Sequence, residues 1–147
     1  MKTCFFIGHR DAPDSVATAL AAAVEHHIVE YGVTEFIVGH YGNFDRLAAA
    51  AVIAARAFYP QITLTLLLPY HPAVRPIETP HGFDGTCYPT NMENVPPRFA
   101  IPRANRYAVE QAEYLIAYVI NAPSNARKVM NYAKKRGVTV ENLACVD

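Results

Sequence analysis

The sequence has few of the residues that define several classes of protein. Its 147 residues include three cysteines, two serines and no tryptophan. No uncharged apolar run reaches the roughly 18 residues that a membrane-spanning helix requires. The cysteines, Cys4, Cys87 and Cys145, are odd in number and scattered, which argues against a disulfide framework. We therefore expect a location in the reducing cytoplasm, with Cys4 and Cys145 as inert core thiols.

The sequence also lacks a net charge, because 13 Lys and Arg residues balance 13 Asp and Glu residues. Such a chain is not expected to bind duplex DNA or an anionic membrane by broad electrostatic attraction, although a small basic pocket is compatible with it. The length suits one domain, residues 1–147, with its own core. The opening residues are too few for a signal peptide and have the pattern of a strand.

Apolar runs and helical patterns alternate along the chain, which predicts a parallel sheet covered on both faces. In this interpretation Asp14 caps the first helix, Gly32 and Gly137 follow helix ends, and Pro102 is the first residue of a helix. The predicted fold is an α/β three-layer Rossmann-like sandwich. With strands numbered along the chain, their expected order in the sheet is 3-2-1-4-5. Strands are expected over 2–8, 34–38, 62–68, 114–119 and 138–143, and helices over 16–31, 44–58, 102–112 and 124–136.

One segment, residues 69–102, breaks this alternation and contains eight of the 11 prolines. A loop of this length inside a compact domain is usually functional or disordered. Its aromatic residues, Tyr70, Phe83, Tyr88 and Phe99, argue against disorder. We interpret it as an ordered lid or flap, and a proline-stiffened surface loop is the open alternative.

Glycines and polar residues gather where three of the predicted strands end, in 8–11, 39–43 and 121–125. In an open parallel sheet, such strand ends lie at the edge that binds ligands. Glycine lets the backbone approach a ligand closely, and a helix start offers unpaired N–H groups to phosphate. Asp45 either caps its helix or accepts a hydrogen bond from a ligand ribose. Each turn is also common as an ordinary strand-to-helix connection, and none matches the Rossmann or P-loop glycine motifs.

The predicted ligand-binding residues come from these turns and from the helix before the fourth strand. Arginines at the start of a helix oppose its dipole, so Arg98, Arg103 and Arg106 need a partner in the ligand, the flap or a second subunit. Alanine-rich helices at 17–23 and 48–57 would also allow a homo-oligomer. The binding candidates are Gly8, His9, Arg10, Gly39, Tyr41, Gly42, Asn43, Asp45, Arg103, Asn105, Ser124 and Asn125.

The catalytic candidates are few. His9 is the best acid or base, with Asp11 or Asp45 as its partner carboxylate. A serine nucleophile is not expected, because the Gly-x-Ser-x-Gly elbow is absent. A metal site of His71, His81 and Cys87 lacks the compact spacing of known metal motifs, so no metal is expected.

Four blocks of the sequence together resemble the SLOG superfamily, the DprA/LOG-like Rossmann-type proteins, and more closely its YpsA-like branch. The resemblance implies a domain that binds a nucleotide or a nucleotide-derived, ADP-ribose-like molecule. By position, Gly8, His9 and Arg10 match the first ligand loop, and Arg103 and Asn105 match an Arg/Asn pair. The second ligand loop is matched by Gly39, Tyr41, Gly42, Asn43 and Asp45. The blocks are CFFIGHR, VGHYGNFDRLAAAAV, RANRYAVEQAEYLIAYV and SNARKVMNYAKKRGVTVENL.

The last loop departs from the family's phosphoribohydrolases, which carry Pro-Gly-Gly-x-Gly-Thr-x-x-Glu with a catalytic Glu. Here residues 121–128 read NAPSNARK, so neither the glycines nor the carboxylate is present. This difference puts hydrolysis of a nucleotide N-glycosidic bond in doubt.

The sequence therefore leaves three functions to compare. The favoured one is a binding domain that senses or sequesters a phosphorylated nucleotide-like ligand without turning it over. The first alternative is a nucleotide hydrolase or transferase using His9, Asp45 or Asp84 under the flap. The weaker alternative is single-stranded nucleic acid binding through Arg98, Arg103, Arg106 and the flap tyrosines.

Overall fold

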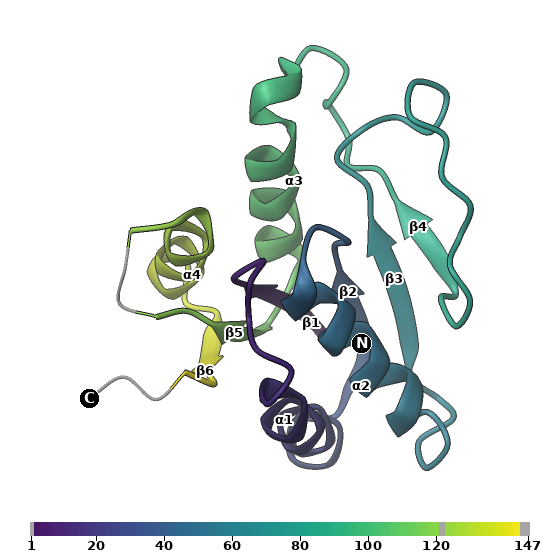
Figure 1. The fold of residues 1–147 in the computed structure, drawn as a ribbon, viewed down its shortest axis with the longest axis vertical. Helices are drawn as coiled ribbons and strands as arrows, with labels where there is room; N and C mark the ends of the chain where they lie inside the picture. Colours follow the sequence, from purple (N-terminus) through teal and green to yellow (C-terminus); the bar gives the residue numbers. More distant parts are fainter. Residues whose placement is uncertain (1, 121–122, 145–147) are drawn as a thin grey trace.

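The computed structural model describes residues 2–120 and 123–144. Within them, six parallel strands form one sheet in the order β4-β3-β2-β1-β5-β6, and four helices cover it (Figure 1). The predicted α/β Rossmann-like sandwich is confirmed. The strands are β1 (Lys2–Gly8), β2 (Val33–Val38), β3 (Thr63–Leu67), β4 (Gly85–Cys87), β5 (Tyr114–Tyr118) and β6 (Thr139–Asn142). The helices are α1 (Val16–Tyr31), α2 (Asn43–Ala55), α3 (Pro97–Gln111) and α4 (Asn125–Lys135).

The core consists of two apolar layers, one on each face of the sheet. Helices α1 and α2 pack on one face and α3 and α4 on the other. Strand β1 contributes to both layers, because Cys4 and Phe6 point to the first face and Phe5 to the second. This alternation explains why β1, with buried side chains on both faces, is an almost continuous apolar run.

The strand order departs from the expectation at one edge. The five predicted strands follow one another as expected, but a sixth, β4, pairs with β3 beyond them. β4 has three residues and belongs to the proline-rich flap. The N–H of Leu68 also donates to the carbonyl of Cys87 across 2.8 Å, which extends the pairing past the strand.

Helix α3 begins earlier than the sequence predicts, so the assignment of Pro102 to its first turn is wrong. The helix starts at Pro97 and contains Pro102 in its interior. Ala100, Ala104 and Ala108 form a buried stripe at helical spacing across this proline. Burial of that stripe stabilises the helix through Pro102 despite the backbone hydrogen bond that proline removes.

The cap assignments are confirmed at two helix ends and wrong at one. Gly32 adopts the left-handed conformation after α1, with φ of 72°, and Gly137 follows α4 with a positive φ of 84°. Asp14 does not cap α1, because its carboxylate accepts hydrogen bonds from Asn43 and Arg46 instead. At its start, α4 is capped by Ser124, which accepts a hydrogen bond from the N–H of Arg127 at 3.1 Å.

The flap is fastened to the sheet near its middle. The Arg56 guanidinium donates to the carbonyl of Gly82 at 2.8 Å and to the Asp84 carboxylate at 2.7 Å. Asp84 also accepts from the N–H of Leu64 at 2.8 Å. Met92 is buried in the layer under α3. Asp84, a catalytic candidate of the hydrolase alternative, is therefore an anchor of the flap.

Among the described residues, no helix is long and apolar enough to cross a membrane. The thiols of Cys4 and Cys87 are free, and burial raises the pKa of both. Cys4 is fully buried in the core, as predicted for an inert thiol. Cys145, expected to be a second core thiol, lies outside the described residues.

Candidate functional site

A cleft lies at the edge of the sheet where β1, β2 and β5 end. Strand β1 pairs in parallel with both neighbours, so these strand ends lie side by side. The direction of winding reverses between β1 and β5, which is the position where open parallel sheets bind ligands. The cleft has a volume of about 240 Å³. Its lining comprises 5–10, Gly39, Tyr41, Asp45, Leu67, Pro69, Ile101, Ala104, Asn105 and 124–126.

The structure brings most of the predicted binding residues to this cleft and leaves three outside its lining. Gly42 and Asn43 do not line the cleft but contact Arg10, which does. Arg103 lines a separate pocket of about 310 Å³, which Arg106 also lines. The nine residues that line the cleft are Gly8, His9, Arg10, Gly39, Tyr41, Asp45, Asn105, Ser124 and Asn125.

Gly42 and Asn43 join the first two turns into one unit. A Cβ atom on Gly42 would lie 2.5 Å from the Cα of Arg10, and the φ of Gly42 is 143°, so only glycine fits there. The backbone N–H of Asn43 donates to the carbonyl of Arg10 at 2.8 Å. Its side-chain amide donates to the carbonyl of Ala12 at 2.6 Å. These contacts fix the backbone from which the Arg10 side chain enters the cleft.

Gly8 and Gly39 make room for neighbouring side chains. A Cβ on Gly8 would lie 2.3 Å from the Phe44 ring, which packs under the end of β1. A Cβ on Gly39 would lie 3.1 Å from the Asp45 carboxylate. These packing roles account for the two glycines without a ligand, although both also line the cleft.

Asp45 braces the second turn and faces the cleft. Its carboxylate accepts a hydrogen bond from the N–H of Tyr41 at 3.1 Å. Burial raises the pKa of Asp45 to about 6, while that hydrogen bond and the nearby Arg10 guanidinium lower it. The carboxyl group therefore changes charge just below neutral pH. Among the described residues, no other acidic side chain lines the cleft.

Arg10 is the cation of the cleft. Its guanidinium lies 5.9 Å from the centre of the Tyr41 ring. Within the described residues, no carboxylate forms an ion pair with it. A guanidinium without an ion-pair partner beside a cleft is suited to bind a phosphate or carboxylate of a ligand.

In the described part of the chain, His9 forms a hydrogen bond with the backbone that follows β5 and not with a carboxylate. Its Nε2 accepts a hydrogen bond from the N–H of Ile120 at 2.9 Å, so this nitrogen serves as an acceptor in the structure. Adding a proton to Nε2 would break that bond. Neither Asp11 nor Asp45 hydrogen-bonds to His9 in the part of the chain that the structure describes. The geometry suits hydrogen-bond donation to a ligand better than proton shuttling.

The third turn contributes the start of α4. Ser124 and Asn125 line the cleft at the positive end of the helix dipole, and Asn105 of α3 lies on the same lining. Asn121, part of the predicted turn, lies outside the described residues. Arg103 and Arg106 do not stand at the N-terminus of α3 as the sequence suggested, since both follow more than one turn of helix, whereas Arg98 lies in its first turn. Arg106 lies 4.7 Å from the Tyr132 ring centre.

The flap adds two residues that the sequence interpretation did not assign to the site. Tyr70 and Arg75 line a second cavity beside the cleft, and Tyr41 belongs to both. The signal in the sequence that could have drawn attention to Arg75 was composition, because Arg75 is the only Lys or Arg between residues 69 and 96. Proline-rich loops do not reveal their course from local pattern, so the sequence could not place this arginine near Tyr41.

Among residues 2–120 and 123–144, no group of three or more His, Cys, Asp or Glu side chains could hold a metal ion. His71, considered for such a site, has its Nδ1 occupied by the N–H of Ala73 at 2.9 Å. Its ring lies edge-on to Tyr88, with the ring centres 5.2 Å apart.

No protein-family model matches the sequence, and no curated protein matches it. Solved structures of similar fold include two of DNA processing protein A (DprA). The Streptococcus pneumoniae protein superposes with a TM-score of 0.68 at 15% identity, over 95% of this chain and 49% of that one. The Helicobacter pylori protein, described as binding single-stranded DNA, gives 0.64 at 13%, over 95% and 63%. The chain thus has a DprA-like Rossmann fold and spans less than two thirds of either protein.

Proposed function

We propose that the cleft binds a phosphorylated nucleotide-like small molecule. The observation that carries this proposal is that Arg10 and the N-terminus of α4 line one cleft at the point where the sheet reverses its winding. A phosphate there would receive charge-assisted hydrogen bonds and the favourable end of a helix dipole. Asn105 and Ser124 would supply neutral hydrogen bonds to sugar or phosphate oxygens. The YpsA-like resemblance and a cytoplasmic location belong to the same proposal and rest on the sequence.

Binding without turnover is the form of the proposal that the side chains favour. Nε2 of His9 is occupied by a backbone N–H, and Asp84 is occupied in the flap anchor. Among the described residues, Asp45 is the acidic side chain that lines the cleft, and burial raises its pKa to about 6. A hydrolase would need a second acid or base beside it. Chromatography of AMP and ADP-ribose after long incubation with the protein is expected to show both intact.

The experiment is thermal unfolding of the chain with AMP, other nucleoside monophosphates and ADP-ribose. A ligand at about 100 times its Kd adds about 2.7 kcal/mol to the free energy of unfolding, which raises Tm by several degrees. Arg10→Gln is expected to remove the shift. The matched control Arg136→Gln, at the far end of α4, should retain it. Absence of any shift with wild-type protein would contradict the proposal.

Single-stranded nucleic acid binding is a second candidate, favoured by the distribution of charge. Residues 97–137, which carry α3 and α4, contain eight Lys and Arg but two Glu. Residues 1–96 contain five Lys and Arg against nine Asp and Glu. The zero net charge is therefore the sum of a basic layer and an acidic one. For this reason it is a weaker argument against nucleic acid binding than a uniformly neutral surface would be. Arg98 lies 4.8 Å from the Phe99 ring centre, a pairing compatible with base stacking.

Fluorescence anisotropy of a labelled oligothymidylate at low and moderate salt tests the second candidate. The double variant Arg98→Gln/Arg103→Gln should weaken binding and reduce the salt slope by about one per lost phosphate contact. Arg46→Gln, on the opposite layer and paired with Asp14, is the control. Equal affinities of the double variant and wild type would exclude this layer as the binding surface.

A second copy of the chain is a further proposed partner. Two large apolar side chains of the α1–α2 half, Val29 and Phe58, are 57% and 81% exposed. Analytical ultracentrifugation of the wild type and Phe58→Ser tests whether a homo-oligomer forms there.

A further inference from the structure

A second cavity lies under the flap, next to the cleft. It has a volume of about 270 Å³ and shares Tyr41 and Pro69 with the cleft. Sites for small molecules usually enclose about 300 Å³ or more, so the cleft alone is small and the two cavities together are within the usual range. The flap cavity is lined by His40, Tyr41, Leu68, Pro69, Tyr70, Arg75, Pro76 and Ile77.

A tight turn in the flap positions Arg75 on this cavity. The N–H groups of Val74 and Arg75 both donate to the carbonyl of His71, at 2.9 and 3.0 Å. The guanidinium of Arg75 lies 3.8 Å from the centre of the Tyr70 ring. The Tyr70 hydroxyl donates in turn to the carbonyl of Pro97 at 3.3 Å, which ties the pair to the start of α3.

The face of the Arg75 guanidinium is covered by the Tyr70 ring, but its N–H donors point outward from the edge of a planar group. Within the described residues, no carboxylate forms an ion pair with Arg75. No acidic side chain of the described residues lines the flap cavity. Arg75 is thus a preorganised cation with donors available to a ligand.

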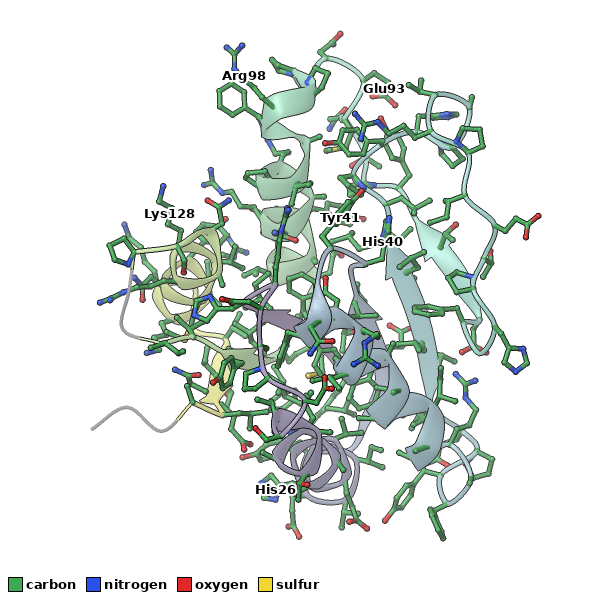
Figure 2. All side chains as sticks on the ribbon, viewed as in Figure 1. His26, His40, Tyr41, Glu93, Arg98 and Lys128 are labelled. Atoms are coloured by element: carbon green, nitrogen blue, oxygen red, sulfur yellow. The ribbon has the colours of Figure 1, made fainter. Side chains whose placement is uncertain are left out.

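Tyr41 stands between this cation and the one in the cleft. Burial and the Tyr70 hydroxyl raise the pKa of Tyr41, whereas the guanidinium groups of Arg75 and Arg10 both lower it, so both cations act on the same phenol. Figure 2 shows Tyr41 and His40 together on the turn after β2, in the centre of the molecule. A ligand that passes Tyr41 would contact Arg10 on one side and Arg75 on the other.

We propose that the flap cavity is a second anion subsite, and that the ligand is a nucleotide with two phosphoryl groups, one bound at Arg10 and the other at Arg75. This inference rests on the proposed function of the cleft and specifies its ligand class. The two phosphoryl groups can come from a pyrophosphate link or from a dinucleotide with a 5′-phosphate. Ligands of both kinds would present a phosphate anion to each of the two guanidinium groups.

Isothermal titration calorimetry of the full chain with AMP, ADP-ribose and the dinucleotide pApA tests the inference. Wild-type protein is expected to bind at least one of the two larger ligands about tenfold more tightly than AMP, as one charge-assisted hydrogen bond allows. Arg75→Gln should abolish that gain and leave the AMP affinity unchanged. The ligand that gains identifies the source of the second phosphoryl group.

Arg136→Gln is the matched control, because the Arg136 guanidinium also lies over an aromatic ring, 5.8 Å from the centre of Tyr132. Arg136 follows the last turn of α4, at the far end of that helix from Ser124 and Asn125, which line the cleft. The affinities of this variant for all three ligands should equal those of the wild type. Arg75 is exposed, so Arg75→Gln should unfold at the wild-type temperature.

Two results overturn the inference while the proposed function survives. In the first, AMP binds and Arg10→Gln weakens it, but neither larger ligand binds more tightly than AMP. In the second, a larger ligand gains affinity that Arg75→Gln does not reduce. Failure of all three ligands to bind the wild type would overturn the inference and the proposed function together.

Discussion

The backbone N–H of Asn43 donates to the carbonyl oxygen of Arg10 across 2.8 Å, although 33 positions separate the two residues. The bond joins the turn after β1 to the first residue of α2. A side-chain amide on the same residue adds a bond to Ala12 at 2.6 Å. The backbone position of Arg10 is therefore fixed by a residue that does not itself line the cleft.

Asn43→Ala should weaken both the fold and the cleft. The substitution removes the side-chain donors to Ala12 and Asp14 and the acceptor for Arg46, so we expect a loss of about 1–3 kcal/mol in the free energy of unfolding. Urea denaturation measures it. Asn131→Ala, exposed on α4, should change stability little. AMP affinity should fall for Asn43→Ala even under conditions where both proteins are fully folded.

Gly42→Ala should be more damaging than a glycine substitution elsewhere. Its Cβ would meet the Arg10 Cα at 2.5 Å, and its φ of 143° is strained for alanine. We expect a loss of about 2–4 kcal/mol. Gly85→Ala is the control, because a Cβ there meets nothing within 4 Å. Similar urea midpoints for the two variants would show that the turn tolerates a side chain.

The charge of Asp45 should make ligand binding depend on pH. Burial raises its pKa to about 6, so lowering the pH from about 7.5 to about 5 removes a negative charge beside the proposed phosphate site. An anionic ligand should then bind several-fold more tightly. Asp45→Asn keeps an acceptor for the N–H of Tyr41 and should bind tightly across the range. The comparison isolates Asp45 from titration of the ligand's own phosphate, which both proteins experience equally.

Stability should respond to Asp45 in a related way. The pKa is higher in the folded state than the ordinary value of 3.8, so the folded state binds more protons than the unfolded state between these values. The contribution of this proton uptake by Asp45 to the free energy of unfolding is fully present below about pH 4 and is lost as the pH rises through about 6. Asp45→Asn should therefore be more stable than the wild type at neutral pH, by about 1–3 kcal/mol. Equal stability of the two proteins at neutral pH would contradict the burial of this carboxyl group.

Most of the fold follows from the sequence because its strands are long apolar runs and most of its helices have clear ends. The boundaries that failed depend on tertiary contacts. β4 contains Gly85 and two other residues, too few for any periodicity, and forms because β3 offers it a free edge. Pro102 normally breaks a helix, but burial of Ala100 and Ala104 on either side maintains α3.

The candidate site was predictable where it depends on strand ends and unpredictable where it depends on the flap. Gly8, Arg10, Gly39 and Asp45 follow strands whose ends must share an edge, so their meeting follows from the topology. Arg75 reaches Tyr41 through a loop whose course is set by distant anchors such as Arg56. The role of Asn43 as a tie between loops also needs the neighbouring loop to be known.

His27 provides a second, opposite pH effect on stability. Burial lowers its pKa, against the raising influence of the Ala23 carbonyl and of Glu141, and its Nε2 is buried without a hydrogen-bond partner among the described residues. The unfolded state therefore binds more protons near pH 6, and stability falls as the pH drops below about 6.5. His27→Leu should reduce this loss in urea denaturation. His26→Leu, at an exposed neighbouring position, should not.

Removing the flap anchor at Asp84 should show whether the cleft and the flap cavity bind ligand independently. Asp84 accepts hydrogen bonds from the Arg56 guanidinium at 2.7 Å and the Leu64 N–H at 2.8 Å, so Asp84→Ala leaves both donors without this acceptor. We expect a loss of about 1–3 kcal/mol and faster proteolysis within the flap. Glu78→Ala, an exposed change in the same flap, should behave as wild type.

The ligand response of Asp84→Ala then distinguishes the cleft from the flap cavity. AMP contacts only the cleft in our proposal, so its affinity should be close to that of the wild type. A ligand with two phosphoryl groups should lose the part of its affinity that depends on Arg75, because the turn that carries Arg75 belongs to the loosened segment. Equal losses for both ligands would mean that the flap supports the whole site and that the two cavities act as one.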